Sequence, residues 1–339
     1  DRSIRGGAAE IEVVDFFTDG SSGIERVLFA DKTVWDRAYF TPEVLNDGVD
    51  EFIGTSGDDS YTVDHPGDTI SEAADAGVDT VHSTVNYQLP DNVENLILEG
   101  VENISGYGNT LDNHIIGNAG NNLLDSWLSI ETGVDVLEGR EGDDTYRVRD
   151  LEHVTIVEQV GGGVDTLITD DRRGCVLPDN VENLRMEMGG TWYDYVTRLT
   201  GNALDNEIIG LSHDQNYIDG GQGADVMWGG TYDDTFVLDN PGDVVHDPSG
   251  FDRVDIHAGY TNSTTYTHAE DSNIEKVVFH LPMLEAHGNS KANHISGADV
   301  IYGYGGNDDL FALEIAYGGD GDYVTRLTGN ALDNETVSY

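Results

Sequence analysis

The chain has 339 residues, and its 65 acidic against 16 basic side chains give a formal net charge of −49 at pH 7. Repulsion between the carboxylates opposes a compact fold, so either the chain is disordered or cations neutralise it, and a hydrophobic content of 38% favours the cations. No basic patch and no apolar run of about 18 residues is present, so we expect neither nucleic acid binding nor membrane insertion.

Residues 1–44 differ in composition from the rest and are predicted to form a β-rich cap or joint. Residues 11–17 and 24–35 read as two strands on either side of the turn sequence TDGSSG. This part is more easily explained as the end of a larger β structure than as an independent module.

From residue 45 the sequence repeats itself with a long period, because Asp59, Asp144 and Asp234 hold equivalent places 85 and 90 residues apart. Unit 1 (45–107) contains LPDNVENLILEG and unit 2 (108–200) contains LPDNVENLRMEMG. Unit 3 (201–287) keeps a degraded copy, SNIEKVVF, and a partial unit 4 covers 288–339. Such self-similarity is typical of a solenoid. The sequence ends inside a repeat, so a fragment or processed chain is expected.

A shorter repeat of nine residues lies inside the long one and follows the pattern G-G-x-G-x-D-x-U-x, where U is apolar. Clean copies are GTSGDDSYT, GREGDDTYR, GGQGADVMW, GGTYDDTFV and GYGGNDDLF. The sixth position is aspartate or its amide. The eighth positions are predicted to line a thin core, and they are Phe52, Tyr61, Ile70, Val81, Leu124, Leu137, Tyr146, Met227, Phe236, Val245 and Val254.

A nonapeptide can form a six-residue turn and a three-residue strand, so two of them complete one coil and equivalent positions stack about 4.8 Å apart. Stacked carboxylates then repel by about 1 kcal/mol per pair even in water. Ca²⁺ takes six to eight oxygen ligands, and the stacked turns supply carboxylates and carbonyls. The sequence therefore predicts an all-β fold, a right-handed parallel β-roll or β-helix solenoid stabilised by several calcium ions.

These repeats resemble the RTX (repeats-in-toxin, haemolysin-type) calcium-binding family over nearly all of residues 45–339, and IERVLFADKTVW resembles a β segment often found beside RTX blocks. In that family, aspartates and glycine carbonyls of neighbouring turns bind Ca²⁺. The resemblance implies that the metal ligands are Asp50, Asp59, Asp68, Asp79, Asp135, Asp144, Asp165, Asp225, Asp234, Asp243, Asp252 and Asp308. Glu72, Glu158 and Asp247 recur beside the repeat and are expected to add a carboxylate.

Several rungs depart from the pattern. No aspartate stands near His153 where the other units have one, and Lys276 replaces the asparagine of the NVEN motif. Gln215 and the asparagine positions are neutral. We expect these rungs to be empty or partly hydrated.

The sequence contains no H-E-x-x-H zinc motif, no G-x-S-x-G nucleophile elbow and no phosphate-binding loop, so the chain is not expected to be an enzyme. In pairs such as Asp58-Asp59 the second member is better explained as a calcium ligand than as a general acid or base. Trp127, Trp192 and Tyr193 leave contact with sugars as an alternative.

Two functions remain. The favoured one is a secreted structural protein, at the cell surface or outside the cell, that folds on Ca²⁺ after export. The RTX resemblance implies type I secretion. The folded product would be a rigid rod that serves as an adhesin, surface-layer element or extracellular filament. Open rung ends allow end-to-end self-association, and a polysaccharide or cell surface is expected as a further partner. The alternative is the RTX module of a secreted enzyme, such as a polysaccharide epimerase or lyase, a protease or a lipase, whose catalytic domain is absent from this sequence.

Overall fold

The computed structural model describes residues 48–127, 134–171, 173–187, 196–257, 273–280 and 285–298. Outside these ranges it describes the strands at 4–6, 9–16, 24–29, 34–36, 265–267, 300–302, 309–311, 327–328 and 335–336. All regular structure in these segments is β. No helix in this part of the chain is long and apolar enough to span a membrane.

The N-terminal strands form an antiparallel sheet in the order β1-β2-β3-β4. Their bounds are β1 Ile4–Gly6, β2 Ala9–Phe16, β3 Ile24–Phe29 and β4 Val34–Asp36. The predicted pair of strands is confirmed, since β2 pairs with β3 from Ile11↔Phe29 to Phe16↔Ile24. The second predicted strand is divided in two, because β3 ends at Phe29 and β4 follows as a separate strand.

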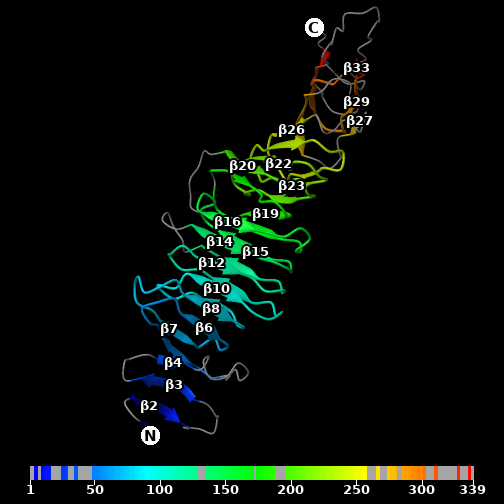
Figure 1. Ribbon diagram of the computed structural model, residues 1–339. Helices are drawn as coiled ribbons and strands as arrows, with labels where there is room; N and C mark the ends of the chain where they lie inside the picture. The colour runs from blue at the N-terminus through cyan, green and yellow to red at the C-terminus, as the bar shows by residue number, and fades with distance from the viewer. Residues whose placement is uncertain are drawn as a thin grey trace, which may run out of the picture. The chain divides into compact units, whose positions relative to one another are not determined.

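The chain divides into two compact units, 1–144 with 152–156, and 145–151 with 157–339. In the first unit, strands on one face pair in parallel in the order β6-β8-β10-β12-β14-β16, and strands on a second face in the order β9-β11-β13 (Figure 1). The first face holds β6 Ser60–Val63, β8 Thr80–Ser83, β10 Asn95–Leu98, β12 His114–Ile116, β14 Asp135–Glu138 and β16 Val154–Val157. The others are β5 Glu51–Ile53, which pairs with β7 Thr69–Ser71, and β9 Tyr87–Gln88, β11 Ser105–Tyr107 and β13 Leu123–Asp125.

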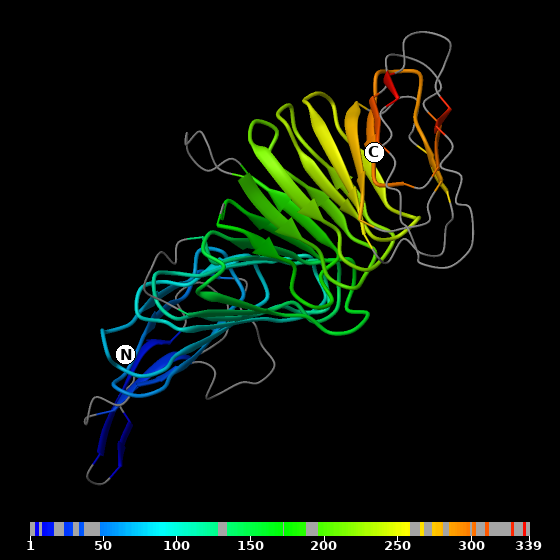
Figure 2. The same cartoon turned by 90° about the horizontal axis from the view of Figure 1, so that it is seen from above.

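The second unit repeats this arrangement, and Figure 2 shows its strands as successive parallel arrows. One face holds β15 Thr145–Val148, β17 Thr166–Thr169, β19 Asn183–Met186, β21 Glu207–Ile209, β23 Val226–Trp228 and β25 Val244–His246. A second face holds β18 Cys175–Val176, β20 Val196–Thr200, β22 Gln215–Asp219, β24 Thr235–Leu238, β26 Asp252–Ile256, β28 Ile274–Phe279, β30 His294–Ser296, β32 Asp309–Phe311 and β34 Glu335–Thr336. A third, short sheet holds β27 Thr265–Thr267, β29 Glu285–His287, β31 Val300–Tyr302 and β33 Leu327–Thr328.

The core is built from rows of apolar residues that stack from rung to rung. Successive side chains of a strand point to opposite faces, so a single apolar position per short strand supplies one inward side chain. In the first unit the row is Tyr61, Val81, Leu96, Ile115 and Leu137, all in register and at most 3% exposed. The parallel solenoid expected from the nonapeptide is therefore confirmed.

Two predicted core residues are only half-buried. Phe52 lies on β5, which pairs with one strand only, and Val245 lies on β25, which ends its sheet. A residue in a terminal rung has a neighbouring rung on one side alone, so its side chain keeps part of its surface in water.

The glycine at the fourth nonapeptide position allows coils to approach closely. Gly142 has a φ of +116°, and a Cβ there would lie 2.5 Å from the carbonyl oxygen of Gly120 on the preceding coil. Gly223 has a φ of +131°, and its Cβ would lie 2.2 Å from the carbonyl oxygen of Leu204. Any side chain at these positions would both strain the backbone and push the coils apart.

Candidate metal centre

The sixth-position carboxylates form ladders in which each is held by the rung before it. Asp79 Oδ1 accepts the backbone N–H of Asp59 at 2.8 Å, and Asp252 Oδ1 accepts that of Asp234 at 2.8 Å. The same contact recurs between Asp50 and Asp68, Asn113 and Asp135, Asn122 and Asp144, Asn206 and Asp225, Asn216 and Asp234, and Asp225 and Asp243. One oxygen of each carboxylate thus keeps the rungs in register.

In two of these carboxylates the second oxygen is placed differently from the first. Asp79 Oδ2 and Asp225 Oδ2 are buried and have no hydrogen-bond partner among the residues that the structure describes, and both residues are 0% exposed. A buried charged oxygen without a partner is costly, so native proteins rarely keep one. A bound cation is the species that such an oxygen fits.

Three carboxylates converge beside the first clean nonapeptide. Ligand oxygens of Asp59, Glu72 and Asp79 lie within 4.8 Å of one another. Gly54 leaves the room for this group, because a Cβ there would lie 1.7 Å from Glu72 Oε2. Tyr61 Oη donates to the same oxygen at 2.5 Å and fixes the glutamate. Burial, with the charges of Glu72 and its neighbours, raises the pKa of Asp79.

A second group combines Asp50, Asp64 and Asp68, whose oxygens also lie within 4.8 Å. Asp68 Oδ2 accepts the backbone N–H of Asp64 at 3.2 Å and that of His65 at 3.1 Å, which closes the turn around the carboxylate. Sequence reasoning missed Asp64. The signal for it was the motif DHPGD at residue 64, which returns as DNPGD at residue 239.

The DNPGD turn at residues 239–243 has the same geometry as the DHPGD turn at residues 64–68. Asp243 Oδ2 accepts the N–H of Asp239 and of Asn240, both at 3.0 Å, while Asp243 Oδ1 accepts the N–H of Asp225 at 3.1 Å. Burial is the main cause that raises the pKa of Asp225 to about 7, and it also raises the pKa of Asp243 and of Asp239. This turn therefore concentrates negative charge that water does not solvate.

Three buried or half-buried carboxylates lie around the nonapeptide that begins at Gly229. A Cβ on Gly229 would lie 2.2 Å from Asp247 Oδ2 and 2.5 Å from Asp234 Oδ2, so both oxygens face the same glycine. Burial, and then the charges of Asp252 and Asp234, raises the pKa of Asp247 to about 9. Burial also raises the pKa of Asp252 to about 6. Without a cation the three groups cannot all be ionised at neutral pH.

This donor set fits calcium. It consists of carboxylate oxygens, which hard cations prefer, and the turns add backbone carbonyls to reach six to eight ligands. The groups around Asp79, Asp68, Asp243 and Asp252 would each hold an ion between neighbouring rungs. The number of ions stays a prediction.

A glutamate that recurs in the repeats of this sequence was missed by sequence reasoning. Glu94 Oε2 accepts the N–H of Asp79 at 2.8 Å and so continues the ladder after its last aspartate. The same contact joins Glu182 to Asp165 at 2.7 Å and Glu275 to Asp252 at 2.9 Å. The signal was the glutamate of the repeated NVEN motif, and its copy IEK in unit 3.

The asparagine turns close without a cation. Asn109 N–H donates to Asn113 Oδ1 at 2.7 Å, Asn113 Nδ2 donates to Asn109 Oδ1 at 3.0 Å, and Asn109 Nδ2 donates to the carbonyl of Val93 at 2.7 Å. Asn118 and Asn122 repeat the pattern. An amide both donates and accepts, so these neutral turns saturate their own hydrogen bonds.

The remaining predicted ligands lie as follows. Asp135, Asp144 and Asp165 are buried at the ladder positions. Glu158 accepts a hydrogen bond from Tyr146 Oη, as Glu72 does from its own tyrosine. Asp308 lies outside the described residues, as do Trp192 and Tyr193.

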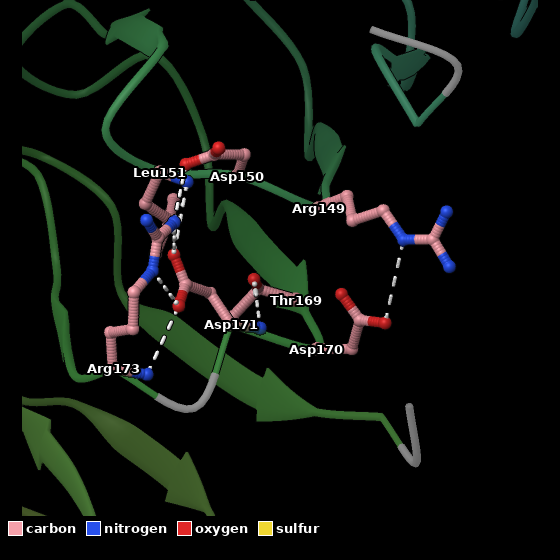
Figure 3. A network of polar contacts seen from close by, with 7 residues as sticks. All are labelled: Arg149, Asp150, Leu151, Thr169, Asp170, Asp171 and Arg173. Atoms are coloured by element: carbon pink, nitrogen blue, oxygen red, sulfur yellow. Dashed lines mark hydrogen bonds and ion pairs between the residues drawn. The ribbon is translucent and has the colours of Figure 1, made fainter. Parts of the chain in front are cut away.

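Arg173 supplies a positive charge in repeat unit 2 (residues 108–200), the repeat that lacks an aspartate near His153 (Figure 3). Arg173 Nε donates to Asp171 Oδ1 at 3.0 Å, a terminal nitrogen of the same guanidinium lies 2.7 Å from Asp171 Oδ2, and Arg173 also contacts Asp150. Although burial works against it, these hydrogen bonds and the N–H of Leu151 lower the pKa of Asp171. A guanidinium therefore does here what a metal ion would do elsewhere.

Comparison with known proteins gives two matches. Residues 3–39, which contain the N-terminal antiparallel sheet, match a family described as haemolysin-type calcium binding protein related domain. A stretch of 65 residues is 48% identical to an endo-1,3-1,4-beta-glycanase, EglC, of Rhizobium meliloti (strain 1021), and it covers 19% of this chain and 14% of that protein. Together with the glycine–aspartate repeats and the parallel β-solenoid, these matches fit an RTX-type calcium-binding repeat protein.

Proposed function

We propose that this chain is a structural module of a secreted protein that folds when it meets Ca²⁺ outside the cell. Export in an unfolded state and a role in an adhesin, surface layer or extracellular filament belong to this proposal. The chain itself would catalyse no reaction.

The observation that carries the proposal is the buried oxygen of Asp79, and again of Asp225, which has no hydrogen-bond partner in the part of the chain that the structure describes. Without metal, each such oxygen destabilises the coil that buries it. A cation that binds the folded state alone stabilises it by mass action, in proportion to the logarithm of its concentration. Low Ca²⁺ in the cytosol would keep the chain unfolded, and higher Ca²⁺ outside would fold it.

The substitution Asp79→Asn tests this proposal because it should stabilise the metal-free fold and weaken the binding of Ca²⁺. The amide keeps the acceptor for Asp59 N–H but removes the buried charge. In EGTA we expect the variant to be at least as folded as the wild type. In calcium we expect the Ca²⁺ concentration at half-folding to rise by about tenfold or more, since even outer partners of a metal site contribute about tenfold.

Circular dichroism during a Ca²⁺ titration measures both effects. Asp91→Asn is the matched control, because it removes one charge from an exposed turn residue, and it should leave the transition unchanged. If Asp79→Asn and Asp91→Asn behave alike, or if the wild type is equally folded in EGTA and in calcium, the calcium-dependent fold is refuted.

A second candidate is favoured by the relative named as a glycanase. This chain would then be the calcium-dependent module of a secreted polysaccharide-degrading enzyme, attached to a catalytic domain encoded beside it. An exposed aromatic such as Trp228, which is 38% exposed, would contact the polysaccharide.

Affinity electrophoresis in gels that contain mixed-linkage β-glucan separates the two candidates. Retardation of the calcium-loaded chain that is lost in Trp228→Ala would favour the enzyme module. Unchanged mobility at all glucan concentrations would favour the structural role.

A further inference from the structure

A cluster of a different composition lies where β26 and β28 end. Asp255, His257 and His280 each offer one ligand atom, and these atoms lie within 4.8 Å of one another. Asp255 lies in β26, and His257 is the first residue after that strand. His280 is the first residue after β28. Two imidazoles distinguish this cluster from the all-carboxylate groups above.

The sheet register places these side chains on one face. Ile256 and Phe279 are paired across β26 and β28 and point into the core at 0% and 3% exposure. Because side chains alternate along a strand, the residues next to them point outward. The N–H of His257 donates to the carbonyl of Leu238 at 2.8 Å, and the N–H of His280 donates to that of Ile256 at 3.0 Å. The ladder therefore holds the backbone of both histidines.

The distances suit a small divalent ion. His280 Nε2 lies 3.4 Å from Asp255 Oδ1, and the two imidazole rings meet edge to face with centroids 4.8 Å apart. Ligands at about 2.0 to 2.1 Å from a tetrahedral ion lie about 3.3 Å from each other. The pair Asp255–His280 already has about that spacing, and the ligand atom of His257 lies within 4.8 Å of both.

The surroundings hold the carboxylate in place. Asp255 is 7% exposed, and Arg253 Nε donates to its Oδ1 at 2.7 Å. Hydrogen-bonded partners of this kind commonly orient the ligands of metal sites. Asp239 follows β24, and Leu238 is paired with Ile256, so Asp239 lies beside His257 on the preceding rung.

We propose that Asp255, His257 and His280 form a binding site for a first-row transition metal such as Zn²⁺, separate from the calcium sites. Imidazole nitrogen suits Zn²⁺, Cu²⁺ and Ni²⁺, whereas Ca²⁺ selects oxygen ligands, so the cluster discriminates against the ion that fills the turns. A bound ion would link two neighbouring rungs through side chains. The inference does not depend on the proposed function.

Titration of the calcium-saturated full chain tests the site, because excess Ca²⁺ keeps Zn²⁺ out of the carboxylate groups. Isothermal titration calorimetry with Zn²⁺ should show one high-affinity ion, and Co²⁺ should give the visible absorption of a nitrogen-ligated, low-coordinate ion. His280→Gln and His257→Gln should each weaken binding by about tenfold or more. His280 is 45% exposed at its side chain, so its replacement leaves the fold intact.

His82→Gln is the matched control, because His82 Nδ1 lies 2.8 Å from Glu99 Oε1 and offers one imidazole with one carboxylate. It should leave the Zn²⁺ affinity unchanged. Equal Zn²⁺ affinity in the wild type and His280→Gln would overturn the proposal, and so would an affinity that falls as Ca²⁺ is raised. The calcium-dependent folding transition of each variant confirms that only the site has changed.

Discussion

At the scale of single residues, the repeats show which side chains belong together. In repeat unit 1, Tyr61 donates a hydrogen bond to Glu72. In repeat unit 3, Phe236 stands at the position of the tyrosine and Asp247 at the position of the glutamate. The Glu72 carboxylate is fixed by the phenol of Tyr61, whereas the shorter Asp247 carboxylate faces Gly229 and accepts the backbone N–H of Ser249 at 3.0 Å. The core residue and the metal-facing residue therefore change as a pair.

The close approach of Gly54 to the Glu72 carboxylate leads to a prediction for single residues. A methyl group at Gly54 would occupy the position of Glu72 Oε2, whereas a methyl group at Gly57 meets nothing within 4 Å. The end of a glutamate side chain is flexible, so Gly54→Ala should displace it without unfolding the coil. We expect the Ca²⁺ concentration at half-folding to rise by about tenfold in Gly54→Ala, since one ligand is lost.

Gly57→Ala is the control within the same turn and should titrate as the wild type does. Equilibrium dialysis at a Ca²⁺ concentration near the midpoint provides the second measurement, and Gly54→Ala should bind fewer ions there. Identical titrations of the two alanine variants would show that Glu72 is not a ligand.

At the scale of elements, the turns are of two kinds. Asparagine turns satisfy their own hydrogen bonds, and aspartate turns keep buried oxygens that need a cation. Both kinds connect short strands that pair in parallel with their neighbours, so the strands alone do not decide whether a rung requires calcium.

The aspartate turns predict how stability depends on pH. In the metal-free fold the pKa of Asp252 is about 6, that of Asp225 about 7 and that of Asp247 about 9, against about 3.9 in an unfolded chain. A carboxyl whose pKa is raised on folding stabilises the fold below its unfolded pKa, and this contribution is lost as the pH rises through the folded pKa. We expect the folded fraction in EGTA to fall between about pH 4 and pH 9.

Calcium should reverse this trend, because the ion replaces the protons. Ca²⁺ affinity should therefore increase over the same interval, and binding at pH 7 should release protons that calorimetry in buffers of different ionisation enthalpy detects. Asp247→Asn should flatten the dependence in EGTA. A folded fraction that rises with pH in EGTA would contradict the burial of these groups.

The contacts of Arg173 with Asp171 and Asp150 lead us to expect that this rung is stabilised by the guanidinium and not by a metal ion. Arg173→Gln would leave Asp171, which is 7% exposed, without its cation. We expect a loss of about 1 to 2 kcal/mol in the free energy of unfolding, at the lower end for a charged hydrogen bond because the guanidinium is half exposed. The number of ions bound at saturation should stay the same.

Urea unfolding in saturating calcium measures the loss, and Arg140→Gln is the control. Arg140, whose side chain is 41% exposed, has its Nε 3.4 Å from Glu138, which is 28% exposed, so its replacement should change little. A lower ion count in Arg173→Gln would mean that the arginine supports a metal site instead of replacing one.

Sequence periodicity predicted most of the fold, because one apolar and one acidic position per nonapeptide fix the core row and the ladder. It missed contacts that lie outside the nonapeptide. Glu94 reaches Asp79 and His280 reaches Asp255 only because coils of unequal length bring them to neighbouring rungs. Those loop lengths follow no period, so the contacts needed the structure.

At the scale of the whole molecule, the formal charge of −49 acts on every coil. General screening by salt would relieve long-range repulsion between exposed carboxylates, since the Debye length is about 8 Å at physiological ionic strength. Screening does not supply a partner to an oxygen that is buried away from water, such as Asp225 Oδ2. The two contributions can therefore be separated by the choice of ion.

We expect Ca²⁺ to fold the chain where Mg²⁺ and NaCl at the same ionic strength do not. Mg²⁺ is smaller, demands an octahedral shell and keeps several of its waters, whereas the carboxylates that converge on Gly229 leave little room for water. Circular dichroism and the hydrodynamic radius, followed in parallel during the three titrations, measure folding and compaction separately. NaCl should reduce the radius of the metal-free chain without adding strand content, because it weakens repulsion and leaves the buried oxygens unpartnered. Equal strand content in NaCl and in Ca²⁺ would mean that overall charge, and not the ladder of turns, holds the chain unfolded.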